Sequence, residues 1–154
     1  MQRISSDLTI TTARSEDLQQ IFELLEECGL PREGLENHLS TTLVARKGIE
    51  IVGCAGLEVY QEHALLRSVA VKSAFRKQRI ALRLTKTNLG LAKEYQVRNV
   101  YLLTETAKIF FSKQGFNQVL RSDVPRIVAQ SIEFTTLCPD TATVMLRTLD
   151  RNEL

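Results

Sequence analysis

A short basic loop, residues 72–79, has the residue types and the position to bind an anion. It follows an apolar segment, residues 65–71, that is typical of a buried strand, and it precedes a helical apolar stripe that begins at Ile80. The loop holds the cationic side chains of Lys72, Arg76, Lys77 and Arg79. The unbonded N–H groups and the positive dipole end of a helix start also attract anions. The sequence therefore predicts a site for a phosphate-bearing ligand beside a strand.

Arg67 is a second position with chemical potential, because it interrupts the apolar strand segment. A buried guanidinium is costly unless it is paired. Two pairings are open. Arg67 either binds an anionic group of a ligand through its bidentate fork, or forms an internal ion pair, for example with Glu58. Period-two alternation would place Arg67 on one face with Leu65, Val69 and Val71.

The composition is that of an ordinary globular domain. The chain has 154 residues, 44% hydrophobic and 25% charged, with a net charge of +2, which predicts a single domain, residues 1–154. A nucleic-acid face would need more net charge and aromatic residues among the cations, so no nucleic-acid partner is expected. No segment is long and apolar enough to predict a membrane span, and residues 1–7 lack the apolar core of a signal peptide.

The three cysteines, Cys28, Cys54 and Cys138, are far apart and lack metal-ligand spacing. They predict reduced thiols, a cytoplasmic location and no metal site. Cys54 and Cys138 are expected to be inert rather than nucleophilic.

The elements that must position the loop and Arg67 follow from the apolar periodicity. Strands are predicted at residues 8–14, 42–46, 51–60, 65–71, 100–103, 116–120 and 141–149. Helices are predicted at residues 15–28, 32–39, 80–95, 106–114 and 124–134, with Ser15 and Thr106 as caps. Strands 42–46 and 51–60 form a hairpin at Lys47-Gly48. Strands 65–71 and 100–103, separated by a helix, are expected to pair in parallel.

Two motifs resemble those of the GNAT superfamily of N-acetyltransferases. The segment Val71-Lys72-Ser73-Ala74-Phe75-Arg76-Lys77-Gln78-Arg79-Ile80-Ala81 resembles the superfamily's motif A, and Phe110-Phe111-Ser112-Lys113-Gln114-Gly115-Phe116 resembles its second signature. The resemblance covers roughly residues 8–116. Leu65-Leu66-Arg67-Ser68 and the segment from Glu133 to Pro139 are similar to the branch encoded beside arsenic-resistance genes.

The resemblance implies an α+β fold, an α/β/α sandwich. Its mixed central sheet is mostly antiparallel, with one parallel pair splayed at the cofactor site. Acetyl-CoA, the implied co-substrate, would lie where the parallel strands part, with its pantetheine along Val69, Ala70 and Val71. Its pyrophosphate would meet the amides of Arg76, Lys77, Gln78, Arg79, Ile80, Ala81 and Leu82.

The chain departs from the superfamily pattern at two positions. Arg79 stands where motif A has a glycine that lets the backbone approach phosphate. Phe111, expected to contact the coenzyme, stands where many members have a tyrosine that protonates the departing thiolate. A thiol pKa of ~8.5 makes thiolate a tolerable leaving group without that acid.

The implied reaction is acetyl transfer to the amine of a small molecule, with an amino-acid-like compound or an arsenic or phosphinic analogue as candidate acceptors. Backbone N–H groups of Val69 and Ala70 would polarise the thioester carbonyl. Glu58 and Glu62, together with His63, are candidate general bases or else solvated hairpin residues. Arg67 and Thr104 are the expected acceptor contacts.

Two alternatives stay open. One is a coenzyme-A-binding sensor or regulatory module without turnover, suggested by Arg79 and Phe111. The other is a protein N-acetyltransferase. The chain is expected to be a monomer or a homodimer.

Overall fold

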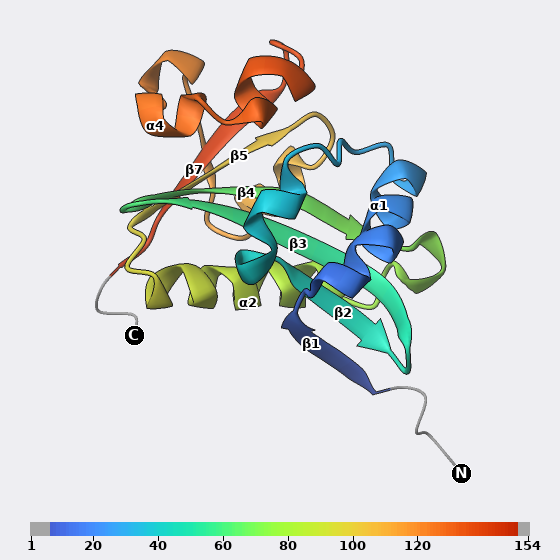
Figure 1. Cartoon of the computed structure of the whole chain (residues 1–154). Coiled ribbons are helices and arrows are strands. Elements are labelled where there is room, and N and C mark those ends of the chain that lie inside the picture. The colour runs from blue at the N-terminus through green and yellow to red at the C-terminus, as the bar shows by residue number, and fades with distance from the viewer. Residues whose placement is uncertain (1–6, 151–154) are drawn as a thin grey trace. The chain divides into compact units, whose positions relative to one another are not determined.

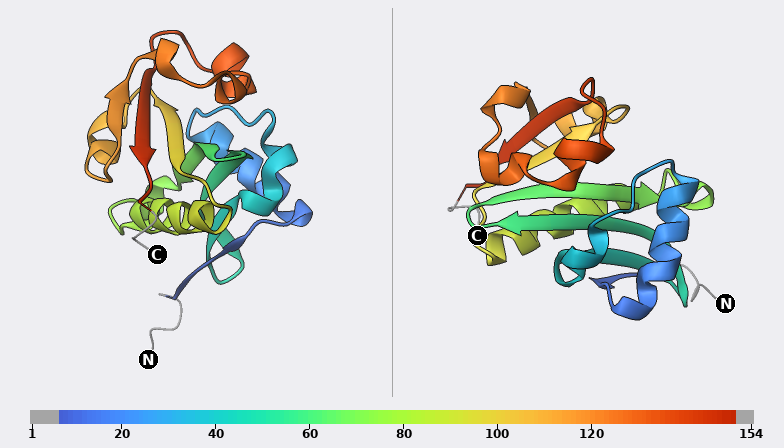
Figure 2. Two further views of the ribbon diagram at one scale, coloured as in Figure 1. Left: turned by 90° about the vertical axis from the view of Figure 1, so that its left-hand side faces the viewer. Right: turned by 45° about the horizontal axis from the view of Figure 1, so that its top comes forward.

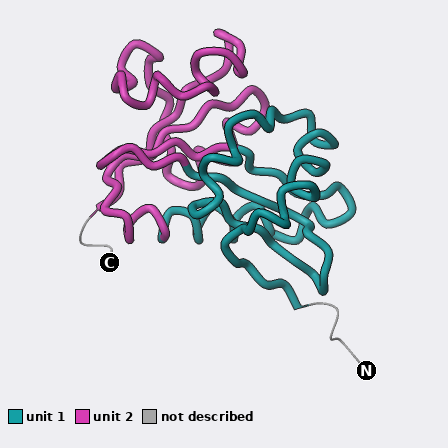
Figure 3. Tube along the Cα trace, viewed as in Figure 1, with its two compact units in different colours: residues 1–57, 68–90 teal, residues 58–67, 91–154 magenta. Residues whose placement is uncertain are grey.

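A computed structural model describes residues 7–150, which fall into two compact units (Figure 3). Unit 1 is the chain up to Leu57 together with Ser68–Gly90, and unit 2 is Glu58–Arg67 together with the chain from Leu91 onward. Residues 1–6, on which the expectation of no signal peptide rests, lie outside the described residues.

The strands form a seven-stranded sheet in the order β1-β2-β3-β4-β5-β7-β6 (Figure 1). They are β1 (Leu8–Thr12), β2 (Leu43–Lys47), β3 (Glu50–Tyr60), β4 (His63–Val71), β5 (Asn99–Thr104), β6 (Asn117–Val119) and β7 (Thr143–Thr148). β3 and β4 contribute residues to both units. The β4–β5 pair is parallel, whereas β1–β2, β2–β3, β5–β7 and β6–β7 are antiparallel. This topology confirms the predicted fold class.

In unit 1, helices cover both faces of β3 (Figures 1 and 2). Helix α1 (Leu18–Glu27) packs Ile21, Leu24 and Leu25 into a cluster with Cys54. The neighbouring Gly53 points the opposite way, where a Cβ would lie 3.0 Å from Leu84 and 3.2 Å from Ile80 of helix α2 (Ile80–Glu94). Burial on two faces explains why the segment Ile51–Leu57 is apolar without alternation.

In unit 2, β5 lies between β4 and β7, and short helical segments cover it. Its apolar cluster joins Tyr101 of β5 and Val144 of β7 to Val128 of helix α4 (Arg126–Ala129) and to Phe134 of a π-helical turn, Glu133–Leu137. Helix α3 (Lys108–Ser112) packs Phe111 edge-on against Phe110 and Phe116, with ring centroids 4.9 and 5.7 Å away.

The expectation of one helix over residues 124–134 is wrong. Pro125 lies before α4 as its N-cap, the helix ends at Ala129, and the chain re-forms a π-helical turn at Glu133. The predicted helix over residues 32–39 is instead a 3₁₀ segment, Leu35–Thr41, with a kink at His38. Further 3₁₀ turns occupy Ser15–Asp17, Ser73–Phe75 and Arg121–Asp123.

The two predicted helix caps are also wrong. Helix α1 begins at Leu18, and the turn before it is closed by Asp17, which accepts the Arg14 N–H at 2.9 Å. Thr104 rather than Thr106 ties down the start of α3, because its Oγ1 accepts the Ala107 N–H at 2.9 Å. In both places an Asp or Thr side chain accepts a backbone N–H of the turn at the helix start, and neither helix has a side-chain N-cap hydrogen bond.

Candidate active site

The basic loop, in unit 1, adopts the backbone conformation of a glycine-rich loop without containing glycine. Lys77 and Arg79 have φ angles of 69° and 63°, in the left-handed region. Side chains with a Cβ adopt this region at a cost of about 1 kcal/mol or more. Arg79 therefore takes the left-handed conformation that glycine adopts freely, at the position where motif A has its glycine.

Helix α2 begins directly after this turn and presents unbonded amides there. Its first backbone hydrogen bond runs from the Arg83 N–H to the Arg79 carbonyl, at 3.0 Å. The N–H groups of Ile80, Ala81 and Leu82 precede that bond and have no carbonyl acceptor within the helix. These groups and the helix dipole are the features on which the predicted anion site depends.

The cations of the loop differ in how they are held. Lys72 Nζ lies 2.8 Å from Glu50 Oε2, and this hydrogen bond raises the pKa of Lys72. Arg76 Nε donates to the Val71 carbonyl at 3.1 Å, which fixes its guanidinium against the end of β4. Lys77 and Arg79 are exposed, so their charges face solvent, where a phosphate would approach.

Strand β4 contains a third left-handed residue, Ser68, with φ 60°. Such a residue inside a strand interrupts the alternation of side chains between faces. The predicted common face of Leu65, Arg67, Val69 and Val71 is therefore interrupted after Arg67, which corrects the period-two expectation. Val69 is half-buried, while Ala70 and Val71 are 4% and 8% exposed.

Arg67, in unit 2, lies in a buried cluster of charges. Its Nη1 is 2.9 Å from Glu58 Oε2, and its Nη2 is 3.3 Å from Glu133 Oε2. The Arg67 side chain is 0% exposed. The internal ion pair with Glu58, one of the two pairings open from the sequence, is therefore present. The second carboxylate, Glu133, has no counterpart among the sequence-based candidates.

Glu58 is the firmly held carboxylate of the cluster. Burial alone would raise the pKa of Glu58, but hydrogen bonds from Tyr60, Ser131 and Arg67 outweigh it and lower this pKa. Burial and the Glu58 carboxylate raise the pKa of Tyr60, so that its phenol stays protonated and donates to Glu58. A carboxylate with a lowered pKa is a weak proton acceptor, which argues against Glu58 as the general base.

Glu133 is held differently. Burial raises the pKa of Glu133. The charge of Arg67 and the hydrogen bond from Cys138 offset this rise in part, whereas the charge of Glu58 adds to it. Cys138 Sγ donates to Glu133 Oε1 at 3.3 Å. Burial and the neighbouring Glu133 raise the pKa of Cys138 to about 12, so the thiol stays protonated. Burial also raises the pKa of the Cys54 thiol to about 12, which agrees with the expectation of two inert thiols.

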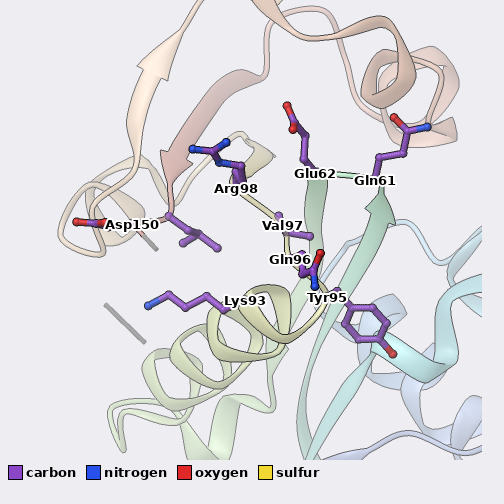
Figure 4. A pocket seen from close by; sticks show the side chains of 9 residues that line it. Gln61, Glu62, Lys93, Tyr95, Gln96, Val97, Arg98 and Asp150 are labelled. Carbon is purple, nitrogen blue, oxygen red and sulfur yellow. The ribbon is translucent and has the colours of Figure 1, made fainter. Parts of the chain in front are cut away.

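Glu62 lies at the turn between β3 and β4, next to the parallel pairs His63↔Asn99, Ala64↔Val100 and Leu65↔Tyr101. The pairing of β4 with β5 ends at Leu65, so Glu62 is at the joined end of the pair rather than at the end where the strands part. It lines a cavity of about 620 Å³ formed by the β3–β4 turn, the end of α2 and the end of β7 (Figure 4). The cavity is lined by Gln61, Glu62, Lys93, Tyr95, Gln96, Val97, Arg98, Leu149 and Asp150.

The remaining candidates are in unit 2. The Thr104 hydroxyl, half-buried at the end of β5, accepts the Ala107 N–H. Phe111 is 6% exposed and packs as an aromatic core residue. Tyr60, Ser131 and Glu133 were missed by sequence reasoning. Only Glu133 had a signal, since an acid inside an apolar segment needs a partner, as Arg67 does.

Two negative findings apply to residues 7–150. No group of three or more His, Cys, Asp or Glu side chains in this range could hold a metal ion. No helix in this range is long and apolar enough to cross a membrane.

The profile of the acetyltransferase (GNAT) domain family matches residues 38–118. The chain therefore belongs to this family, which confirms the class predicted from motif A and from the second signature.

Individual relatives refine this placement. The chain is 30% identical over 119 residues to an amino-acid acetyltransferase of Vibrio cholerae, an alignment that covers 71% of this chain and 27% of the relative. The fold is similar to N-acetylglutamate synthase of Neisseria gonorrhoeae, solved with coenzyme A and N-acetyl-glutamate, with TM-score 0.81, 22% identity and coverage of 94% of this chain and 36% of that one. Rv2747 of Mycobacterium tuberculosis, solved with CoA, has TM-score 0.78 and 22% identity over 92% of this chain and 99% of that chain.

Proposed function

We propose that the chain is an N-acetyltransferase that moves the acetyl group of acetyl-CoA to the amine of a small molecule carrying an anionic group. The observation that carries the proposal is the loop at residues 72–79. Its left-handed Lys77 and Arg79 lead into the unbonded amides of α2, an arrangement suited to a pyrophosphate. Family membership supports acetyl-CoA as the donor.

The residues have the following roles in this proposal. The amides of Ile80, Ala81 and Leu82, with the side chains of Lys77 and Arg79, bind the pyrophosphate, and Val69, Ala70 and Val71 line the pantetheine. The N–H groups of Val69 and Ala70 polarise the carbonyl. Phe111 contributes apolar contact but no acid, so the thiolate leaves without a proton donor. Thr104 contacts the acceptor.

The acceptor is proposed to be an amino acid or a close analogue. The named activity of the Vibrio cholerae relative and the ligand of the Neisseria structure support this class. The likeness of residues 65–68 and 133–139 to the arsenic-operon branch makes amino-acid-like arsenic and phosphinic acids the first analogues to screen. Arg67 is the proposed partner of the acceptor's anionic group.

The proposal is tested first by binding. Coenzyme A at a hundred times its Kd should stabilise the chain by about 2.7 kcal/mol. The double variant Lys77→Gln/Arg79→Gln should lose most of this shift in melting temperature. Lys113→Gln, an exposed cation on another loop, is the control and should keep it. Absence of any shift at millimolar coenzyme A contradicts the proposal.

The second test is turnover. Acetyl-CoA is incubated with a panel of amino acids, their phosphinic and arsenic analogues, and amine-bearing peptides, and free thiol is measured. Thiol release with an anionic small amine supports the proposal. Coenzyme binding without thiol release from any amine would instead favour the sensor alternative, for which the missing phenol at Phe111 is the specific observation.

A further inference from the structure

Arg67 is shared unequally between two carboxylates. Glu58 Oε2 lies 2.9 Å from Nη1, within the range of about 2.7–2.9 Å for hydrogen bonds between charged groups, whereas Glu133 Oε2 lies 3.3 Å from Nη2. Glu58 belongs to a long strand and is also held by Tyr60 and Ser131. Glu133 is thus the looser partner of the guanidinium, and the Nη2 side of Arg67 is the replaceable contact.

The charges of the cluster also favour replacement of Glu133. One guanidinium faces two buried carboxylates, so burial and the charge of Glu58 both act against an ionised Glu133. An anion from solvent that takes the Nη2 contact would bring its own carboxylate, while Glu133 would regain water. The exchange keeps the number of anions on Arg67 constant, so it avoids the cost of stripping a buried cation of its partner.

The backbone around Glu133 is suited to such a movement. Glu133 begins a single π-helical turn, a structure that is rare and frequent at functional sites. Its neighbours Ile132, Thr135 and Thr136 are exposed, so the turn lies at the surface of unit 2. The Glu133 N–H donates to Ser131 Oγ at 3.2 Å, and the Cys138 N–H to the Glu133 carbonyl at 3.0 Å. The side chain can therefore swing while these backbone contacts hold the turn.

From these contacts we infer that Glu133 occupies, on Arg67, the place that the anionic group of the acceptor takes during turnover. Resting on the proposed function, this makes Glu133 a specificity-determining residue. An acceptor binds only if its own anion replaces the Glu133 carboxylate. A neutral amine of the same shape leaves Glu133 in place and gains nothing from Arg67.

The test compares Glu133→Gln with the parent. The amide keeps the shape of the side chain but gives up the charge that competes for Arg67. Acceptors are amino acids that the parent acetylates, each paired with its own primary carboxamide, which lacks the carboxylate. KM for the carboxylates should fall about tenfold in Glu133→Gln, a change of 1.4 kcal/mol. KM for the carboxamides should stay the same, and kcat should stay within about twofold.

Two further variants sharpen the comparison. Glu133→Asp keeps the charge but withdraws it from Nη2, so its KM should lie between those of the parent and Glu133→Gln. Asp123→Asn removes an exposed carboxylate of the same unit and should leave KM at the parent value. Equal KM values in parent and Glu133→Gln overturn the inference. So does an equal fall for carboxamides, which would mean that Glu133 only blocks space.

A binding measurement separates this inference from the proposed function. Sodium succinate, without coenzyme or amine, should raise the melting temperature of Glu133→Gln more than that of the parent, since the variant lacks the charged carboxylate that competes with succinate for Nη2. If the parent acetylates no carboxylated amine, the proposed function fails, and the succinate shifts still decide the inference. Equal shifts in the two proteins would refute it.

Discussion

Replacing Arg67 by Met should destabilise the chain more than any loss of a surface ion pair. Met has a similar length and keeps the apolar contacts of the side chain, but it leaves the carboxylates of Glu58 and Glu133 facing each other, 1% and 7% exposed, without a cation. Removing one partner of a buried ion pair costs roughly 3–5 kcal/mol. For a chain of 154 residues this corresponds to a fall in melting temperature of roughly 6–20 °C.

The loss should depend on pH, and its sign follows from Glu58. The folded pKa of this carboxyl is lower than the ordinary 4.5, so its stabilising effect is present above that value and is lost as pH falls through the folded pKa. Without Arg67, the cluster of Glu58, Glu133, Tyr60 and Cys138 holds no cation, and burial becomes the main influence on the pKa values of the two carboxyls. The difference between parent and variant should therefore be large at pH 7, shrink as pH falls below the ordinary carboxyl pKa of 4.5, and be lost as pH falls through the lowered pKa of Glu58 in the parent.

Thermal unfolding of the parent, Arg67→Met and the triple variant Arg67→Met/Glu58→Gln/Glu133→Gln between pH 4 and 8 is the assay. The triple variant should recover most of the stability, because uncharged groups of similar volume replace a buried ion cluster at little cost. Arg46→Met, which breaks the more exposed pair with Asp17 (2.8 Å), is the comparison for an ordinary ion pair. If Arg67→Met melts within about 2 °C of the parent at pH 7, the carboxylates are not held as a buried charged pair.

Three other substitutions test the cofactor side. Phe111→Tyr should change turnover by less than about tenfold, or ~1.4 kcal/mol in the barrier, since a thiolate leaves unaided, and a gain of a hundredfold would contradict this. Gly53→Ala places a methyl 3.0 Å from Leu84 Cδ1 and 3.1 Å from the Ala70 carbonyl. It should cost about 1–3 kcal/mol in thermal unfolding and weaken coenzyme A binding through the start of α2, whereas full stability would show that the helix shifts freely. Arg79→Gly should leave melting unchanged or higher, because the left-handed strain disappears, and should weaken coenzyme A about tenfold in calorimetry through loss of a phosphate contact. Unchanged affinity would exclude the Arg79 side chain from the site.

Much of the fold was predictable because its signals are local. The unbroken apolar run of β3 and the basic turn before Ile80 are each explained within a few residues of sequence. The hairpin at Lys47-Gly48 formed as expected, with φ 63° at Gly48. The loop was predictable for the same reason, since its charges and its helix start are adjacent in the chain.

The buried charge cluster was not predictable in full, because its members come from distant parts of the sequence. A cation in an apolar strand needs a partner, so a partner for Arg67 was expected, and Glu58 on the neighbouring strand was a candidate. Glu133 lies in a segment whose apolar spacing indicated a continuous helix, and this spacing gives no sign of the break after Ala129. The left-handed backbone conformation of Ser68 was not predicted, because a serine residue does not by itself indicate that conformation.

The position of β7 has a consequence for how the chain is made. β7, the last strand of the described residues, lies between β5 and β6, so each of these two strands keeps an edge of unpaired backbone groups until β7 has been synthesised. A ribosome that terminates before Thr143 would release a product with open edges on β5 and β6. In this product Val144 would be missing from the apolar cluster that contains Tyr101. Such nascent chains are candidates for aggregation and chaperone capture, and premature stop codons in this short region should be far more harmful than their distance from the basic loop would suggest.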